Sequence, residues 1–269
     1  MKKILSLLLF TFLLSCSGNI FQDATSTSSD EDYILLARQY LNEQKYNESI
    51  DVITTKLSAD RQTSSTVREI LASNYGGKCG LNFVQFTTNL ASQTTGSAFY
   101  RLMVPFVGLS VDPSMCKQSL SIMDLIGTTA QRTTNQNAFA AVMGMVLMGT
   151  AMRSYADLTP VLGNGVVDVN LCSGVTDTQI DDIIIGFGYM SKNISAVGQS
   201  LVGPSSLGSV ENLITTCTTI AGSSCEITDP ASITPMIRST VRDLLNTQEY
   251  GIGTFSTGGN DLLIPGACP

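Results

Sequence analysis

The chain has no histidine among its 269 residues, which limits the chemistry that its side chains can perform. Histidine is the base in Ser-His-Asp and Cys-His hydrolases and is a frequent zinc ligand. The cysteines also form no CxxC pair, the spacing that is typical of cysteine ligands to zinc. The sequence therefore predicts no metal site, no cofactor and no catalytic activity.

Ser114 and Lys117 have the SxxK spacing of penicillin-interacting enzymes, but the Ser-Asp-Asn and Lys-Thr-Gly companions are missing. Two fixed residues arise easily by chance in a serine-rich chain. Asp177, Asp181 and Asp182 are interpreted as residues that cap and solvate a helix start, where negative charge offsets the helix dipole. An enzyme that uses serine, lysine or carboxylates is the weakest of three functional hypotheses.

The segment from Asn164 to Asp168 is similar to part of a calcium-binding loop. An EF-hand places oxygen ligands four and two residues before Asn164, where this chain has Pro160 and Leu162. The last ligand position holds Leu171 where a glutamate is required. The sequence therefore does not predict calcium binding.

Six cysteines follow Cys16, and an even number in an exported chain indicates disulfides. Their pairing is left open by the sequence. Cys217 with Cys225 is the preferred pair, because the turn at residues 221–224 lets the chain double back. Cys79 with Cys116 is a second expectation, which would tie neighbouring helices together, and Cys172 and Cys268 complete the set.

The N-terminus has the pattern of an export signal. Lys2 and Lys3 precede an uncharged apolar run over residues 4–14, which is about half the roughly 20 residues of a bilayer-spanning helix. Leu13, Ser15 and Cys16 follow the order of the lipobox, so the N-terminus resembles that of bacterial lipoproteins. The resemblance implies a signal peptide at residues 1–15 and acylation of Cys16. Ser17 after the cysteine favours the outer membrane, with the domain on its periplasmic side or at the cell surface.

The mature chain is predicted to be acidic. Residues 1–15 hold two of the 15 basic residues and none of the 22 acidic ones, which leaves 13 against 22 and a net charge of −9. Such a surface repels nucleic acid and anionic lipid, so acyl chains must hold the protein at the membrane. Residues 16–31 are interpreted as the lipidated cysteine and a flexible tether that spans about 20 Å.

Helical spacing of apolar residues predicts an all-α domain over residues 32–269. A first helical segment covers 32–57 with a turn at 42–45, and a second covers 65–75 and ends at Gly76-Gly77. Further helices are expected at 82–90, at 99–109 with a kink or start at Pro105, from Asp112-Pro113 onward, around 138–152, from Asp177 to Val202, at 205–220 and from Thr234-Pro235 to about Tyr250, followed by an irregular tail at 251–269.

Residues 33–90 resemble a tetratricopeptide repeat. Ala37 and Leu41 match its first helix, residues 46–50 match the opening of its second helix, and residues 68–75 match the first helix of a following repeat. Ser49 departs from the pattern, since alanine is usual there, and Asp60 stands where proline usually ends the second helix. The predicted fold is therefore a helical-hairpin or tetratricopeptide-like array, or an irregular helical bundle, stabilised by disulfides.

The repeat resemblance implies a partner-binding groove formed by the outward residues of each first helix. Its candidate residues are Arg38, Gln39, Asn42, Arg68 and Asn74. The first functional hypothesis is a non-catalytic, lipid-anchored periplasmic adaptor that binds an envelope protein or peptide there. The second is a carrier or transporter accessory lipoprotein, in which the uncharged segment 138–152 lines an apolar cavity; the simpler interpretation of that segment is a core helix.

Overall fold

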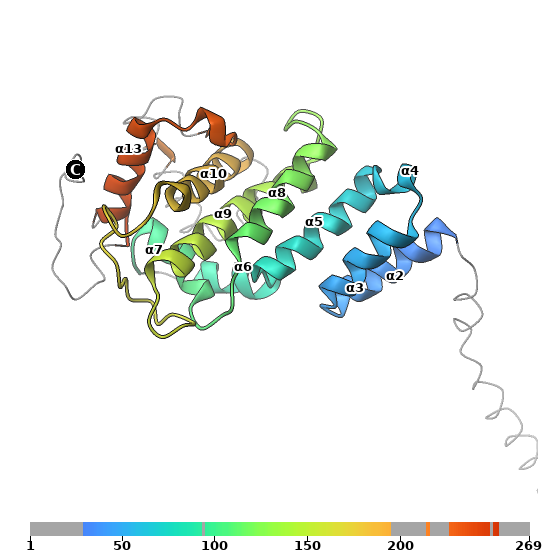
Figure 1. Cartoon of the computed structure of the whole chain (residues 1–269), viewed down its shortest axis with the longest axis horizontal. Helices are drawn as coiled ribbons and strands as arrows, with labels where there is room; N and C mark the ends of the chain where they lie inside the picture. Colours follow the sequence, from blue (N-terminus) through green and yellow to red (C-terminus); the bar gives the residue numbers. More distant parts are fainter. Residues whose placement is uncertain (1–28, 93–94, 195–213, 216–225, 248–249, 253–269) are drawn as a thin grey trace, which may run out of the picture. The chain divides into compact units, whose positions relative to one another are not determined.

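The computed structural model describes residues 29–92, 95–194, 214–215, 226–247 and 250–252, and all regular secondary structure in these ranges is helical (Figure 1). The all-α prediction is confirmed. The chain divides into two compact units, Met1–Val67 and Arg68–Pro269, with the boundary inside helix α5.

The first unit contains a helical hairpin. Its elements are α2 (Asp30–Asn42), α3 (Tyr46–Asp51), a π-helix (Val52–Lys56) and α4 (Ala59–Gln62). The predicted turn is confirmed, and Gln44 adopts a left-handed conformation there with φ of 59°. Ser49 is buried, and its hydroxyl donates to the Ala37 carbonyl at 2.7 Å. This bond explains why serine is tolerated at a position where a repeat usually has alanine.

The end of the hairpin is tied back to its start by Asp30. This carboxylate accepts hydrogen bonds from the Ser58 backbone N–H at 2.8 Å and from the Ser58 hydroxyl at 2.5 Å. Both bonds lower the pKa of Asp30, the hydroxyl bond having the larger effect. Arg61 also pairs with Glu31. Polar contacts therefore join α2 to the start of α4 within this unit.

Helix α5 (Ser65–Cys79) extends further than predicted. The expectation that Gly76-Gly77 ends it is wrong, because the stop is made by Gly80, which has φ of +110°. The Gly80 N–H donates to Gly77 O and the Leu81 N–H donates to Gly76 O, both at 3.1 Å, the pattern of a Schellman cap. The glycine with positive φ, and not the first glycine of the run, determines where the helix ends.

The second unit contains the end of α5 and the helices that follow it. These are α6 (Phe83–Ser92), α7 (Ala98–Met103) with a 3-10 turn (Val104–Phe106), α8 (Pro113–Ile126), α9 (Thr134–Ala156), α10 (Asp177–Asn193), a 3-10 turn (Pro230–Ser232) and α13 (Pro235–Asn246). Asp112 caps α8 and Thr234 caps α13, each before a proline in the first turn, as predicted. Helix α13 ends earlier than expected.

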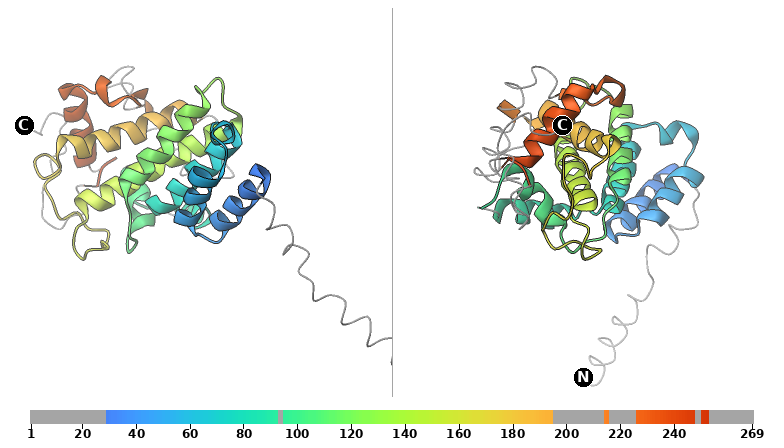
Figure 2. Two further views of the ribbon diagram at one scale, coloured as in Figure 1. Left: turned by 45° about the vertical axis from the view of Figure 1, so that its right-hand side comes forward. Right: turned by 60° about the vertical axis from the view of Figure 1, so that its left-hand side comes forward.

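Helix α9 is the core of the second unit, where it contacts α7, α8 and α10 (Figure 2). Every residue from Ala140 to Met152 is buried. Among the described residues, α9 is the one helix long and apolar enough to cross a bilayer, but 78% of its most apolar window is buried inside the protein. The interpretation of segment 138–152 as a core helix is confirmed, with a start at Thr134 that is set by a Thr133–Gln136 capping box.

Two glycines let α9 and α10 approach closely. A Cβ atom on Gly144 would lie 2.5 Å from the Gly186 carbonyl oxygen, and one on Gly186 would lie 2.7 Å from the Gly144 carbonyl oxygen. Both distances are shorter than van der Waals contact. The helix pair therefore depends on the absence of side chains at this crossing.

The start of α10 corrects two expectations. The cap is Thr176 and not Asp177, because the Thr176 hydroxyl accepts from the Gln179 N–H and the Gln179 side chain accepts from the Thr176 N–H. Asp182 is buried at 3% exposure and not solvated. The predicted continuation of this helix to Val202, the predicted helix at 205–220 and the tail from 253 onward lie outside the described residues.

Candidate functional site

A polar groove runs between α8 and α10 in the second unit, and residues 228–230 close one side of it. Its volume is about 360 Å³, and a neighbouring pocket of about 290 Å³ shares three lining residues with it: Asp124, Tyr189 and Thr228. We call both together the α8–α10 groove. Its lining residues are Lys117, Leu120, Ser121, Asp124, Gly127, Thr128, Thr129, Arg132, Ile185, Tyr189, Lys192, Asn193, Thr228, Asp229 and Pro230.

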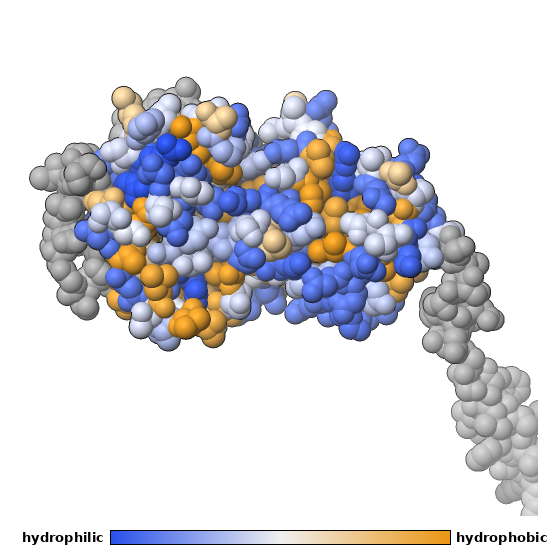
Figure 3. All heavy atoms as spheres, viewed as in Figure 1, coloured by the Kyte–Doolittle hydropathy of each residue, from blue (hydrophilic) through white to orange (hydrophobic). Residues whose placement is uncertain are grey.

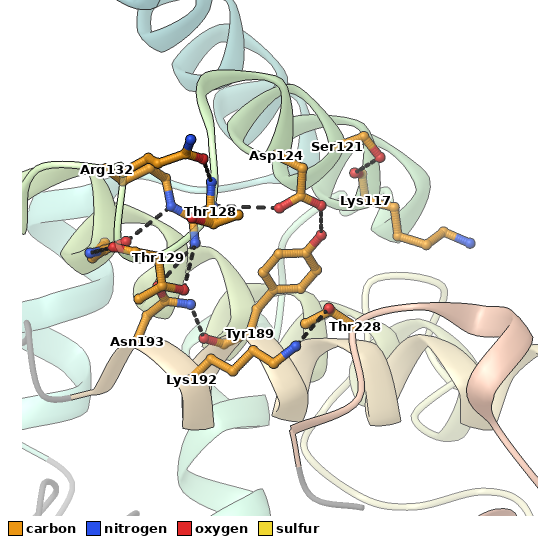
Figure 4. A network of polar contacts seen from close by, with 12 residues as sticks. Lys117, Ser121, Asp124, Thr128, Thr129, Arg132, Tyr189, Lys192, Asn193 and Thr228 are labelled. Carbon is orange, nitrogen blue, oxygen red and sulfur yellow. Dashed lines mark hydrogen bonds and ion pairs between the residues drawn. The ribbon is translucent and has the colours of Figure 1, made fainter.

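Asp124 and Tyr189 face each other across the centre of this groove (Figure 4). The Tyr189 hydroxyl donates to Asp124 Oδ2, which joins α8 to α10. Burial raises the pKa of Tyr189 well above its ordinary value, and the hydrogen bond and negative charge of Asp124 raise it further. Tyr189 is therefore a neutral hydrogen-bonding group at physiological pH and is not an ionised base.

Arg132 lies in the segment between α8 and α9 and lines the smaller pocket of the groove. Its side chain is 3% exposed and pairs with Asp124 at 3.5 Å. It also donates to Asn137 Oδ1 at 3.0 Å and to Asn193 Oδ1 at 3.1 Å. Asn193 in turn donates to the Tyr189 carbonyl at 2.7 Å. One guanidinium thus connects the ends of three helices (Figure 4).

Two lysines contribute ammonium donors to the groove. Lys117 Nζ lies 2.7 Å from Asp182 Oδ1, and Lys192 Nζ donates to Thr228 Oγ1 at 3.2 Å. Asp182 also accepts from the Tyr155 hydroxyl at 2.8 Å. Burial, followed by the negative charge of Asp182, raises the pKa of Tyr155. The groove therefore presents both positively charged donors and negatively charged acceptors.

The groove presents hydrogen-bonding side chains from several elements. Its serine and lysine do not form a nucleophile–base pair, because Ser121 donates to the Lys117 backbone carbonyl at 3.0 Å. Among the described residues, no group of histidine, cysteine and acidic side chains is arranged to hold a metal ion. What the arrangement offers is a set of hydrogen-bond partners for a polar ligand.

The SxxK spacing and the calcium-like segment both have structural explanations. Ser114 Oγ donates to Asp112 Oδ1 at 2.6 Å, whereas Lys117 contacts Asp182, so the two residues of the motif have separate partners. Asp168 accepts the backbone N–H groups of Leu158 and Thr159 at 2.6 and 2.7 Å. Its carboxylate therefore holds the loop between α9 and α10.

The predicted partner-binding residues fall into both units. In the first unit Arg38, Gln39 and Asn42 are exposed on α2, and Gln39 donates to Glu43 at 2.9 Å. In the second unit Arg68 donates to the Leu125 carbonyl at the end of α8. The placement of Asn74 on an exposed groove is wrong, because this residue is 0% exposed and its amide donates to the Ile70 carbonyl at 2.8 Å.

The Cys79–Cys116 disulfide is confirmed. It joins the end of α5 to α8, with a Cα–Cα distance of 5.1 Å. Cys172 is also disulfide-bonded. The preferred pair Cys217–Cys225, together with Cys268 and the predicted lipidation site Cys16, lies outside the described residues.

The central residues of the groove, Asp124 and Tyr189, were not predicted from the sequence. Asp124 is a single charge in the apolar run at residues 122–126, and Tyr189 is a single polar ring in the apolar stretch at 183–190. An isolated polar residue in an apolar helix is the signal that could have found them. Asp124 and Tyr189 are 65 residues apart in the sequence, so the spacing of residues does not predict their contact.

Comparison with known proteins adds no assignment: the sequence matches no protein-family model, and no curated protein or solved structure shows significant similarity to it.

Proposed function

We propose that this protein is a non-catalytic, lipid-anchored adaptor of the bacterial cell envelope, and that its α8–α10 groove binds a segment of a protein or peptide partner. The observation that carries the proposal is the groove itself, whose two pockets have volumes of about 360 and 290 Å³. Donors and acceptors around them come from four side chains: Asp124, Tyr189, Lys117 and Lys192. A polypeptide backbone needs alternating donors and acceptors, which such a surface supplies.

The groove favours an adaptor over the alternative of a small-molecule carrier. A carrier of the kind considered above requires a cavity lined by the central helix. No residue of segment 138–152 lines the α8–α10 groove, and Phe139 alone of this segment lines the 210 Å³ pocket beside Glu69. Ligand pockets for apolar small molecules are also lined mainly by apolar side chains, whereas polar residues outnumber apolar ones among the residues that line this groove.

The cellular location in this proposal is inferred from the N-terminal sequence pattern. Lys2, Lys3, the apolar run at 4–14 and Cys16 support export and acylation, with the domain on the periplasmic side of the outer membrane. The exposed face of α2, with Arg38, Gln39 and Asn42, is a further surface that a large partner can contact. Arg68 is less suited to that role, because it already donates to the Leu125 carbonyl.

Site-specific photocrosslinking tests the groove directly. Ser121 is an exposed groove residue, and Thr88 on α6 is an exposed position that lines none of the pockets described above. With p-benzoylphenylalanine at each position in living cells, we expect a discrete crosslinked protein from position 121 and none from position 88. Equal labelling from both positions, or none from position 121, would contradict groove binding.

A second arm tests occupancy of the groove by the captured protein. Ser121→Trp adds a bulky side chain from an exposed position and should abolish co-purification of that protein. Thr88→Trp is the matched control and should retain it. Co-purification that survives Ser121→Trp would move the binding site away from the groove, and the exposed face of α2 would be tested next with Arg38→Ala.

A further inference from the structure

The loop between α9 and α10 exposes apolar side chains at its tip. Leu158 is 47% exposed, Val161 is 85% exposed and Leu162 is 45% exposed. We call residues 158–162 the apolar loop. Apolar side chains gather along the lower edge of the second unit in Figure 3, at the place where the α9–α10 connection lies in Figure 1. Exposed apolar residues that cluster in this way mark interaction sites.

The apolar loop is held in its conformation by charged side chains beneath it. Arg153 donates to the Val161 carbonyl at 2.6 Å and to the Leu162 carbonyl at 3.0 Å. Asp157 is 0% exposed and accepts the N–H groups of Asn164 and Gly165 at 2.9 and 2.8 Å. The apolar side chains are therefore presented by a fixed scaffold, which reduces the entropy lost on binding.

Several backbone groups of the loop are also paired within the protein. Asp168 accepts the Leu158 and Thr159 N–H groups, and the Gly163 N–H donates to the Pro160 carbonyl at 2.6 Å. The Gly108 N–H, from the segment after α7, donates to the Leu162 carbonyl at 2.8 Å. Backbone groups that are paired in this way can leave water at low cost, whereas unpaired groups cannot enter hydrocarbon.

The tip carries no charge. No Asp, Glu, Lys or Arg occurs from residue 158 to 167, and the flanking Asp157 and Asp168 are engaged by backbone N–H groups. A surface for a protein partner usually has a polar rim that adds specific hydrogen bonds. A projecting, uncharged tip whose Val161 and Leu162 carbonyl groups are already paired instead suits a fluid apolar phase, which needs no matching cavity.

We propose that the apolar loop inserts into the interfacial region of a lipid bilayer and orients the second unit on the membrane. This inference rests on the membrane location given in the proposed function. Acylation at Cys16 would supply the stable attachment, since three apolar side chains alone give weak binding. Because the mature chain has a predicted net charge of −9, we expect insertion to depend on apolar contact with zwitterionic lipid and to be insensitive to salt.

The lack of tryptophan in the chain allows a clean test. Val161→Trp introduces a single fluorophore at the tip, and Met236→Trp introduces one at a 78% exposed apolar position on α13 as the matched control. Each full-length protein, as processed by the cell, is mixed with phosphatidylcholine and phosphatidylethanolamine vesicles that carry brominated acyl chains. Vesicle flotation and tryptophan emission are then measured on the same sample.

We expect both proteins to float with the vesicles, with blue-shifted and several-fold more strongly quenched emission at position 161 than at position 236. Adding Leu158→Asp to Val161→Trp should reduce the quenching to the level of the control, without loss of the folded circular dichroism spectrum. Quenching that is unchanged by high salt would support apolar insertion.

The possible outcomes distinguish insertion of the apolar loop from attachment through the acylated Cys16. Flotation without quenching at position 161 overturns loop insertion and leaves the anchored adaptor intact. Flotation that is lost with Leu158→Asp supports the loop and contradicts acylation as the main attachment. Failure to float, with no quenching, contradicts both. A crosslinker at position 161 that captures a protein, when the Val161→Trp variant shows no quenching by lipid, overturns insertion in favour of a protein interface.

Discussion

At the scale of single residues, Asp182 combines burial with two partners on other elements. Its carboxylate accepts from Tyr155 and pairs with Lys117, whose side chain is 37% exposed. Asp182→Ala leaves the half-buried Tyr155 hydroxyl without this acceptor, so we expect a loss of about 2–3 kcal/mol in the free energy of unfolding. Urea unfolding measures this loss.

The adjacent Asp181 is the matched control. It pairs with Arg238 at 2.7 Å in a more exposed position, so Asp181→Ala should cost about 1 kcal/mol or less. Equal losses in the two variants would show that Asp182 gains nothing from its burial and its tyrosine partner.

Two tyrosines with raised pKa values, the buried Tyr189 and the half-buried Tyr155, make the protein sensitive to alkali. The pKa of Tyr189 and that of Tyr155 are both raised, in each case first by burial. Above about pH 10 the unfolded chain releases these phenolic protons and the folded chain keeps them, so stability is present below that pH and falls as the pH rises toward the folded values. Tyr189→Phe should reduce the slope of unfolding free energy against pH in this window. An unchanged slope would contradict the raised pKa.

At the scale of elements, the contact between α9 and α10 depends on glycine. Gly144→Ala places a methyl group 2.5 Å from the Gly186 carbonyl oxygen, which can move only with its helix. Alanine favours a helix over glycine by roughly 1 kcal/mol, yet we expect Gly144→Ala to lower stability by about 1–3 kcal/mol because the helices must separate. Thermal or urea unfolding provides the measurement.

Gly76 in α5 is the matched control, because Gly76→Ala makes the same glycine-to-alanine change as Gly144→Ala. A Cβ atom there would lie 3.1 Å from the Met143 sulfur, at the end of a flexible side chain. Gly76→Ala should therefore change stability by less than about 1 kcal/mol. If both alanine variants behave alike, close backbone approach does not determine the α9–α10 crossing.

At the scale of the whole molecule, the predicted anchor determines where the domain works. Cys16→Ser should abolish palmitate incorporation and either block removal of residues 1–15 or release the protein from the membrane fraction. Fractionation with metabolic labelling measures both outcomes. Unchanged palmitate incorporation in this variant would end the lipoprotein prediction.

The sequence alone determined the helical class of the protein and many of its local starts and turns. The Asp112-Pro113 and Thr234-Pro235 starts, the turn at 42–45 and the burial of segment 138–152 follow from side chains and their immediate neighbours, and these are confirmed. Caps, prolines and apolar runs act over one or two helical turns, so their effects are visible without knowledge of the fold.

Tertiary structure decided the features that join distant segments. The burial of Asn74 and Asp182 and the meeting of Asp124 with Tyr189 depend on which helices pack together. Packing interactions between residues 60 or more positions apart outweigh local preferences of a few tenths of a kcal/mol to about 1 kcal/mol. The α8–α10 groove exists only because α9 brings the two helices side by side, and no local pattern in either helix contains that information.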